Sequence, residues 1–154
     1  MNSFIKKLVQ EERLKLVDPS DEIAESYLKK ADKSLISAKT LLEIENFDDA
    51  TALVYYSMYY SALALLFKCG IKCENHTGTI ILLKELFKID NKQIKKAKKE
   101  RVDKQYYVEF KATKNEVREG IQIAEKFLIN LRTNIEKMKE SEKITYKNEL
   151  KKYF

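Results

Sequence analysis

The stretch DDATALVYYSMYYSALALLFKCG, from Asp48 to Gly70, decides the fold of this chain. Its eighteen residues from Ala50 to Phe67 carry no charge, and apolar side chains occur on every side instead of on one face. A helix that is hydrophobic all round is buried, either in a protein core or in a membrane. The segment must therefore be surrounded by apolar partners of one kind or the other.

The membrane alternative rests on length, because eighteen uncharged residues reach the lower limit for a bilayer span. Two features favour a protein core. Thr51, Ser57, Ser61 and four tyrosines make the run more polar than a typical spanning helix. The flanking segments are also amphipathic and need an apolar partner, which this helix can supply. We expect a central core helix and no membrane association.

A second long helix is predicted directly before the central one. Asp18-Pro19-Ser20-Asp21 combines the hydrogen-bond acceptor, proline and acid that are typical of a helix start. Apolar residues then recur at three- and four-residue spacing up to Leu42. Only residues 45–47 interrupt the pattern, so the two helices are expected to lie antiparallel. Asp48 is the predicted N-cap of the central helix, and Gly70 is its predicted C-terminal stop.

Other segments predict further helices. They are expected over residues 3–16, after His76-Thr77-Gly78, over residues 91–104, and after the capping box that runs from Thr113 to Glu116. Residues 71–75 are expected to form a loop. Gly120, inside the last long helix, is expected to mark a close crossing of two helices.

The composition suits an all-α protein, because 154 residues contain only three glycines and one proline and 35% are charged. We predict an antiparallel up-and-down bundle of four to five principal helices around the buried central helix. The second helix, the fourth helix and the helix after Thr113 are expected to cover it. Residues 1–141 are predicted to form one domain, and residues 142–154 a polar C-terminal tail or a short docking helix.

The N-terminus and the cysteines indicate the compartment. The first residues, MNSFIKKLVQEERL, acquire charge too early for a signal peptide. Cys69 and Cys73 can form no disulfide framework, and no cluster of His or Cys lies near them to complete a metal site. We expect a cytoplasmic protein with no metal and no cofactor.

Positive charge is concentrated in one predicted helix. Residues 92–104 hold seven Lys or Arg against two acids within a chain of net charge +6. Such clustering can mark contact with phosphate groups, and the alternative is a solvated lysine-rich face. The candidate contacts are Lys92, Lys95, Lys96, Lys98, Lys99 and Lys104.

Four tyrosines of the central helix fall in two pairs, Tyr55 with Tyr59 and Tyr56 with Tyr60. Members of each pair share a helix face, because they are four residues apart. Buried phenols need hydrogen-bond partners, so some of these rings must reach a surface or a polar network. One interpretation is simple packing with the hydroxyl tips in water. The other is a dimer or ligand surface, since tyrosine is enriched at interfaces.

The residue types exclude most catalytic chemistry. One histidine cannot build a multi-histidine zinc site, and the three glycines form no phosphate-binding loop. The remaining combination is His76, Arg101 and Tyr107 with lysines around them. An imidazole could move the proton of an RNA 2′-hydroxyl while an arginine stabilises the phosphate. The alternative role for His76 is to cap its helix.

The run YYSMYYSALALLFKCGIKCENHTG, from Tyr55 to Gly78, resembles the HEPN superfamily (higher eukaryotes and prokaryotes nucleotide-binding). That family often shows a tyrosine-rich central helix, a short loop, and a His-Thr-Gly type opening of the next helix. The segments from Arg101 to Tyr107 and from Ala124 to Leu128 are similar to two further family segments. The resemblance covers about Ala24 to Leu131.

The resemblance implies an all-α bundle, usually a homodimer and often encoded beside a small nucleotidyltransferase that acts as its partner or antitoxin. Many members are metal-independent ribonucleases with an Arg-x(4–6)-His motif. In this chain the corresponding positions before His76 are Cys69, Gly70 and Ile71, so the usual motif is absent. We do not expect ribonuclease activity from the usual arrangement.

Three functional hypotheses follow. The leading one is a HEPN-type module that binds nucleotide, RNA or a nucleotidyltransferase partner in a toxin–antitoxin-like or defence system. The second is a metal-independent endoribonuclease toxin with a non-standard site at His76, Arg101 and Tyr107. The third is a non-catalytic dimeric scaffold.

Overall fold

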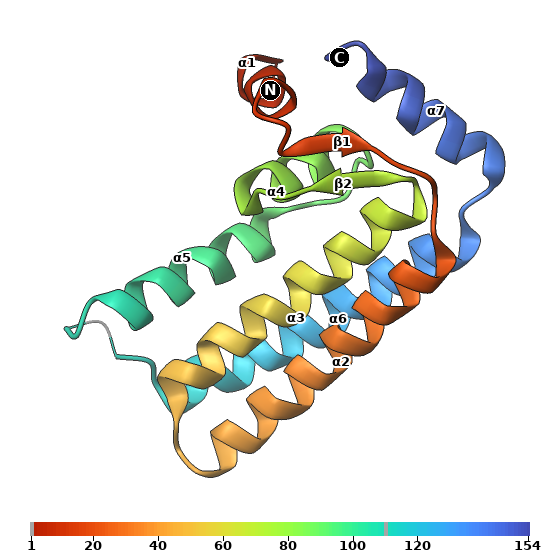
Figure 1. Cartoon of the computed structure of the whole chain (residues 1–154). Helices are drawn as coiled ribbons and strands as arrows, with labels where there is room; N and C mark the ends of the chain where they lie inside the picture. The colour runs from red at the N-terminus through yellow and green to blue at the C-terminus, as the bar shows by residue number, and fades with distance from the viewer. Residues whose placement is uncertain (1, 110) are drawn as a thin grey trace.

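The computed structural model describes residues 2–109 and 111–154, which form an all-α bundle with one small sheet (Figure 1). The elements in chain order are α1 (Asn2–Gln10), β1 (Leu14–Leu16), α2 (Asp21–Glu43), α3 (Phe47–Lys68), β2 (Ile71–Cys73), α4 (His76–Glu85), α5 (Lys92–Tyr106), α6 (Lys114–Lys137) and α7 (Glu140–Lys151). The prediction of an all-α bundle is confirmed.

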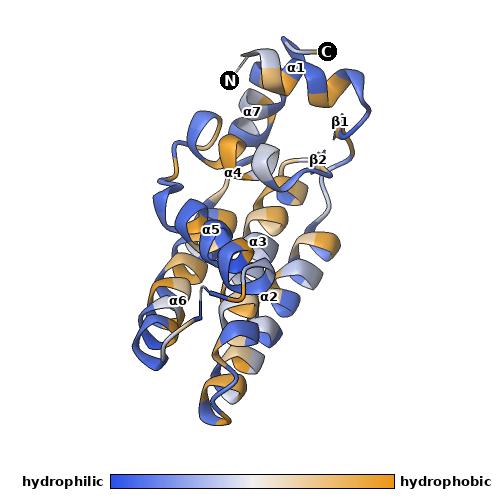
Figure 2. Cartoon of the chain, turned by 90° about the vertical axis from the view of Figure 1, so that its left-hand side faces the viewer, coloured by the Kyte–Doolittle hydropathy of each residue, from blue (hydrophilic) through white to orange (hydrophobic). Residues whose placement is uncertain are grey.

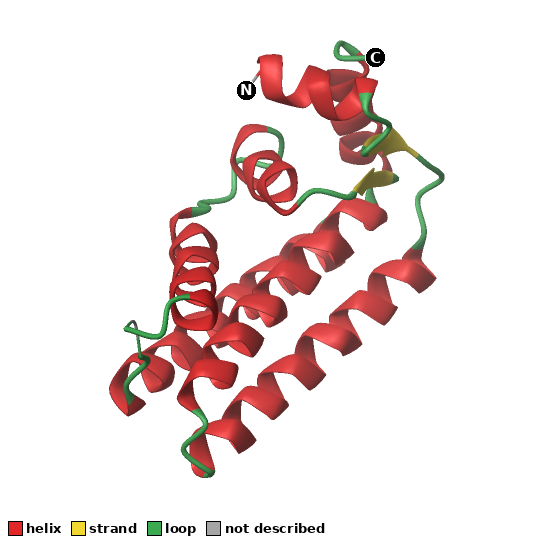
Figure 3. Ribbon diagram, turned by 60° about the vertical axis from the view of Figure 1, so that its left-hand side comes forward, coloured by secondary structure: helices red, strands yellow, loops and turns green. Residues whose placement is uncertain are grey.

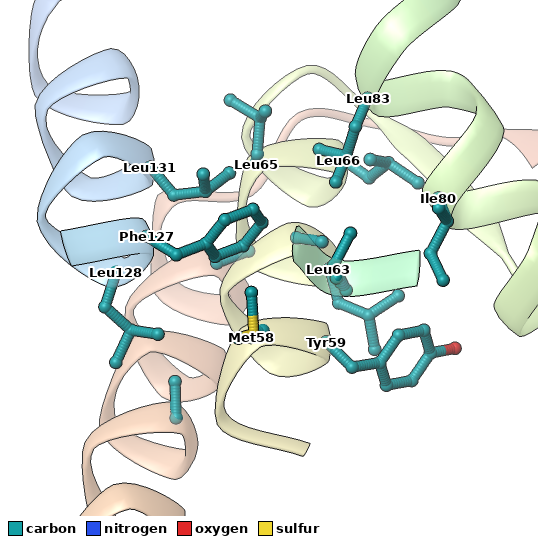
Figure 4. Packing of buried hydrophobic residues seen from close by; sticks show 14 of the residues in the cluster. Met58, Tyr59, Leu63, Leu65, Leu66, Ile80, Leu83, Phe127, Leu128 and Leu131 are labelled. Carbon is teal, nitrogen blue, oxygen red and sulfur yellow. The ribbon is translucent and has the colours of Figure 1, made fainter. Parts of the chain in front are cut away.

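The central helix α3 is the buried helix that the sequence predicted. Figure 4 shows side chains of α4 and α6 directed at it from two sides. Met58, Leu65 and Leu66 are fully buried there. By length and composition α3 could cross a membrane, but 72% of its most apolar part is buried inside the bundle. The helix is thus accounted for as a core element, which does not indicate a membrane protein.

The helices that cover α3 differ in part from the prediction. α2 lies antiparallel along it and α6 packs on another side, as expected. The basic helix α5, which was not expected among the covering helices, packs against α3 more extensively than α4 does. Two apolar side chains, Ile94 and Ala97, suffice to bury one face of α5. Figure 2 shows the rest of this helix as mainly hydrophilic.

The predicted cap at Asp48 is wrong. Helix α3 begins at Phe47, and Asn46 occupies the N-cap position without a side-chain cap hydrogen bond. The Asp48 carboxylate instead accepts a hydrogen bond from the backbone N–H of Ala112 at 2.9 Å. This bond ties the start of α3 to the segment that leads into α6.

The first helix is shorter than predicted, and the predicted loop over residues 71–75 begins as a strand. Helix α1 ends at Gln10, and β1 pairs antiparallel with β2, with Leu14 opposite Cys73 and Leu16 opposite Ile71 (Figure 3). In each strand a lysine stands between two apolar residues, which matches the two-residue period of a half-buried strand. Three residues are too few to separate this period from a helical one in the sequence.

Gly70 ends the central helix, as predicted. Its φ of +72° is unfavourable for residues with a side chain, and a Cβ there would lie 2.4 Å from the backbone oxygen of Val17. The backbone N–H of Val17 donates to the Gly70 oxygen at 2.9 Å. The tight turn therefore sets the direction in which β2 leaves α3.

The C-terminal part of the chain is helical. Thr113 and Glu116 form the predicted capping box at the start of α6. Gly120 faces α3, where an added Cβ would lie 3.4 Å from Val54 Cγ1, so the predicted close crossing is present. Residues 140–151 form α7, whose Tyr146 ring packs on Phe87 with centroids 4.7 Å apart. Of the two alternatives predicted for residues 142–154, a polar tail or a short docking helix, most of the segment is a docked helix.

Candidate functional site around His76 and Arg101

His76 is the first residue of α4, and its position is fixed by its neighbours. Asn75 caps the helix, because its side-chain oxygen accepts from the backbone N–H of Gly78 at 2.8 Å. A Cβ on Gly78 would lie 2.5 Å from Leu8 Cδ1, so α4 starts in close contact with α1. The alternative that His76 itself caps the helix is therefore wrong, and its imidazole is available for other contacts.

Two tyrosines of α3 hold the imidazole in place. The His76 ring stacks face to face on Tyr59, with centroids 4.0 Å apart and planes 7° from parallel. The hydroxyl of Tyr55 lies 2.6 Å from His76 Nδ1. Tyr55 and Tyr59 are both buried, so neither ring can move far. The other ring nitrogen, Nε2, is left as the atom that can meet a ligand.

The hydrogen-bonding capacity of Tyr55 indicates where the imidazole proton lies. Burial raises the pKa of the Tyr55 phenol well above its usual range, so the hydroxyl keeps its proton. Within the described residues this hydroxyl makes no hydrogen bond except the one to His76. Because a buried donor needs an acceptor, the phenol donates to Nδ1. In the neutral imidazole the proton is then on Nε2, which makes Nε2 a hydrogen-bond donor.

Arg101 of α5 lies beside the same tyrosines. Its Nη1 donates to the Tyr56 hydroxyl at 3.1 Å, and its guanidinium carbon lies 5.1 Å from the ring centroid of Tyr55 and 5.4 Å from that of Tyr56. Cation–π attraction to the two rings stabilises this position. No carboxylate of the described chain forms a salt bridge with Arg101, and its buried Nε has no hydrogen-bond partner there. The positive charge is therefore not neutralised.

The electrostatics of the cluster favour an anion. Burial lowers the pKa of His76, and the positive charges of Arg101 and Lys98 lower it further. Lys98 itself donates from Nζ to Thr77 Oγ1 at 2.6 Å, so it is held at the start of α4. Two cations thus stand near an imidazole that stays neutral to lower pH than usual. A phosphate or carboxylate bound here would compensate both charges.

The remaining predicted residues lie on α5 or just beyond it. Lys92, Lys95 and Lys99 are exposed, as is Lys96, which pairs loosely with Glu100 at 3.8 Å. Lys104 is mostly shielded, and its Nζ donates to the Lys111 backbone oxygen at 3.1 Å beside Glu116. The basic face of α5 therefore consists of Lys92, Lys95, Lys96 and Lys99.

Tyr107 follows the last turn of α5 and is half-exposed. It stands six residues after Arg101, which corresponds to about 9 Å along a helix axis. The phenol that accepts a hydrogen bond from Arg101 Nη1 belongs to Tyr56. The structure thus brings together His76 and Arg101 with Tyr55, Tyr56 and Tyr59. The sequence offered a signal for this grouping, because the tyrosine pairs share helix faces, but it could not show which face meets α4 and α5.

These features define a class: a helical-bundle domain whose central helix carries tyrosines that hold an imidazole beside an unneutralised guanidinium. A sequence profile of the HEPN domain matches residues 24–134, which are most of the chain. The chain therefore belongs to the HEPN domain family.

A segment of 63 residues is 35% identical to a protein of Methanocaldococcus jannaschii named "Putative toxin MJ0142". The match covers 41% of this chain and 43% of that protein, so the similarity extends over less than half of either. A HEPN-type module related to a toxin-like protein agrees with the leading interpretation of the sequence.

Proposed function

We propose that this chain is a HEPN module that binds RNA or a nucleotide through phosphate contacts at His76 and Arg101. The observation that carries the proposal is the guanidinium of Arg101, which phenol groups position and no acid of the described chain neutralises. Arginine binds phosphate through several N–H donors at once. The Nε2–H of His76 supplies a further donor on the same side of α3.

The basic face of α5 supports a polyanion over a small anion as the ligand. Lys92, Lys95 and Lys99 are exposed on this face and form no ion pair within the described part of the chain. Lysines that track a phosphate backbone raise affinity without reading sequence. An RNA strand that leaves the His76 site and passes round α5 would meet these charges on the side of the helix away from Arg101.

The biological setting belongs to the same proposal. We place the protein in the cytoplasm, in a toxin–antitoxin-like or defence system, as a homodimer with a small nucleotidyltransferase as partner. The toxin-like name of the relative supports this setting. A dimeric scaffold without a nucleic-acid role is the outcome that would remain if neither RNA nor nucleotide bound.

A metal-independent endoribonuclease is the second candidate, and the neutral His76 favours it. The imidazole would take the proton of a 2′-hydroxyl while the oxygen bonds to phosphorus. The P–O5′ bond would break, and water would protonate the departing oxygen. Arg101 would stabilise the charge that develops on the phosphate. This route requires Nε2 without its proton, whereas the Tyr55 contact favours the other tautomer. Binding is therefore the better-supported function.

One experiment separates these outcomes. Purified protein is titrated into fluorescein-labelled RNA, and RNA integrity is followed on a gel with and without EDTA. Arg101→Gln and His76→Gln should weaken binding at least about tenfold, since a charged hydrogen bond contributes roughly 1.5–3 kcal/mol. Arg118→Gln is the matched control, because Arg118 is exposed on α6.

Three results are distinguishable. Salt-sensitive binding without cleavage supports the proposed module. Cleavage that survives EDTA and disappears in His76→Gln establishes the ribonuclease instead. Binding that Arg118→Gln weakens as much as Arg101→Gln would mean that the cluster is not the site.

A further inference from the structure

A line of tyrosine rings continues from Arg101 across the bundle to α2. Tyr56 lies near Tyr60 on α3, with centroids 5.8 Å apart and planes 23° from parallel. Tyr60 in turn lies 6.2 Å from Tyr27 of α2, at an angle of 27°. Tyr27 then meets Phe67 at 5.5 Å and 16°. Four near-parallel rings thus extend away from the His76 site.

Neighbouring rings in this line are displaced sideways from one another and are not stacked face to face. Face-to-face stacking brings centroids to about 4 Å, as the contact between His76 and Tyr59 does at 4.0 Å. At 5.8 and 6.2 Å, near-parallel rings are displaced sideways, which leaves part of each face uncovered. Tyr27, Tyr56 and Tyr60 are all half-buried, whereas Tyr59 is buried. Tyr27, Tyr56 and Tyr60 therefore each keep part of their surface accessible to solvent.

Positive charge accompanies the rings. Lys30 of α2 holds its ammonium 4.6 Å from the ring centroid of Tyr60, and Arg101 lies 5.4 Å from that of Tyr56. An ammonium over the Tyr60 ring shows that this face is open to a polar group. The hydroxyls of Tyr27 and Tyr60 form no hydrogen bond to any described residue, so the rings are not held by their polar ends.

We propose that Tyr56, Tyr60 and Tyr27, with Lys30 and Arg101, form a binding track for single-stranded nucleic acid. Bases stack on the rings, and Lys30, which lies over the Tyr60 ring in the free protein, turns with Arg101 to the phosphates between them. The inference rests on the proposed function, because the track begins at the Arg101 phosphate contact. It adds α2 to the binding surface and specifies an unpaired strand as the ligand.

Stacking on tyrosine distinguishes this ligand from a duplex. The bases of a duplex are already stacked on each other and cannot reach a ring on a protein surface. Unpaired bases can, and aromatic platforms of this kind bind single strands with little sequence preference. Oligouridylate is the best probe, because its bases stack weakly on one another and are free to stack on the protein.

The test compares a fluorescein-labelled oligouridylate with a labelled blunt RNA duplex by anisotropy. Tyr60→Leu and Tyr27→Leu remove a ring but keep apolar volume, and Lys30→Gln removes the charge. Each tyrosine change should weaken oligouridylate binding by at least about fivefold, in line with the contribution of one stacked base. Duplex binding should change little. Lys29→Gln is the matched control, because Lys29 is the exposed neighbour of Lys30 on a different side of α2.

Cross-linking provides a readout that a purely structural role would not produce. Oligouridylate that carries 5-iodouridine should cross-link on irradiation to Tyr60 or Tyr27, as peptide mapping would show. Cross-links elsewhere would overturn the track even if Tyr60→Leu failed to fold.

The experiments distinguish an error in the track from an error in the proposed function. Suppose that Arg101→Gln weakens binding and that the changes at Tyr27, Lys30 and Tyr60 do not. The phosphate site would then stand, and the track would be ruled out. Equal losses on single strand and duplex would contradict a stacking platform. No RNA binding by the unaltered protein would remove both.

Discussion

His76 is the single histidine of the chain, so its imidazole gives one unambiguous signal in an NMR titration. Its pKa lies below the usual value of about 6.5. Burial is the main cause, and the positive charges of Arg101 and Lys98 add to it. Arg101→Gln should raise this pKa, because it removes a positive charge that disfavours the imidazolium. Tyr55→Phe should also raise it, because the phenol donates to the neutral ring. Lys92→Gln is the control and should leave the titration unchanged.

The pH dependence of binding tests the proton position on His76. If Nε2 donates to phosphate, acidification keeps that donor and adds a positive charge. RNA affinity at constant salt should then hold or rise as pH falls from 7.5 through the lowered pKa of His76. A general base would show the opposite trend in the rate of RNA cleavage, because protonation removes its function. Anisotropy across this range decides, and an affinity that falls on acidification would contradict the Nε2–H assignment.

Replacement of Gly70 by alanine adds one methyl group and should lower the stability of the fold strongly for so small a change. Gly70→Ala places a Cβ 2.4 Å from the Val17 oxygen at a φ of +72°. Strain of this kind costs about 1–3 kcal/mol, so the free energy of unfolding in urea should fall by at least that amount. Gly120→Ala is the matched control, since its Cβ would meet Val54 only at 3.4 Å within a helix. Equal stability of the two variants would contradict the strained turn.

At the scale of one element, α5 presents different residues on different faces. Ile94 and Ala97 bury it against the bundle, Arg101 and Lys98 face the His76 cluster, and the exposed lysines face solvent. The sequence could predict the charge of this helix. It could not predict that Lys98 and Lys104 are held by Thr77 and Lys111, because those contacts join segments far apart in the chain or across a turn.

The exposed lysines of α5 should contribute to RNA affinity only through salt-dependent contacts with phosphate groups. Each phosphate contact that is lost lowers the slope of log affinity against log salt by roughly 0.7 for a single strand. Lys95→Gln and Lys99→Gln should each reduce the slope by about that amount, measured by anisotropy at several salt concentrations. Lys126→Gln, an exposed change on α6, should not alter it. An unchanged slope in both α5 variants would mean that this face is only solvated.

At the scale of the whole molecule, the long helices followed from periodicity and from strong end signals. The uncharged run and the Thr113 capping box are local features, so the sequence alone places them. The start of α2 falls two residues later than predicted, because Ser20 caps the helix instead of Asp18 and Pro19 lies before it. The two strands and the Asp48 bond to Ala112 depend on partners distant in the chain. The grouping of His76 with Arg101 is of the same kind. Residue types alone selected His76 and Arg101 as candidates, and only the packing of α4 and α5 on α3 brought them together.

The docked helix α7 provides a test of whether the molecule unfolds as one unit. Leu150 is 2% exposed and borders a cavity of about 200 Å³ that Ile5 of α1 and Leu82 of α4 also line. Large-to-small core substitutions of this type lower the free energy of unfolding by about 2–5 kcal/mol. The loss for Leu150→Ala should be near the lower value, because the space beside Leu150 is already open.

If α7 belongs to the cooperative core, Leu150→Ala should lower the midpoint of a single thermal transition followed by circular dichroism. Ile144→Ala is the matched control on the same helix, because Ile144 is 59% exposed and its loss should change the midpoint little. A small early transition with an unchanged main midpoint would instead show that α7 detaches by itself. In that case the Tyr146 contact with Phe87 and the bond from Lys147 Nζ to the Val17 oxygen would not couple this helix to the bundle.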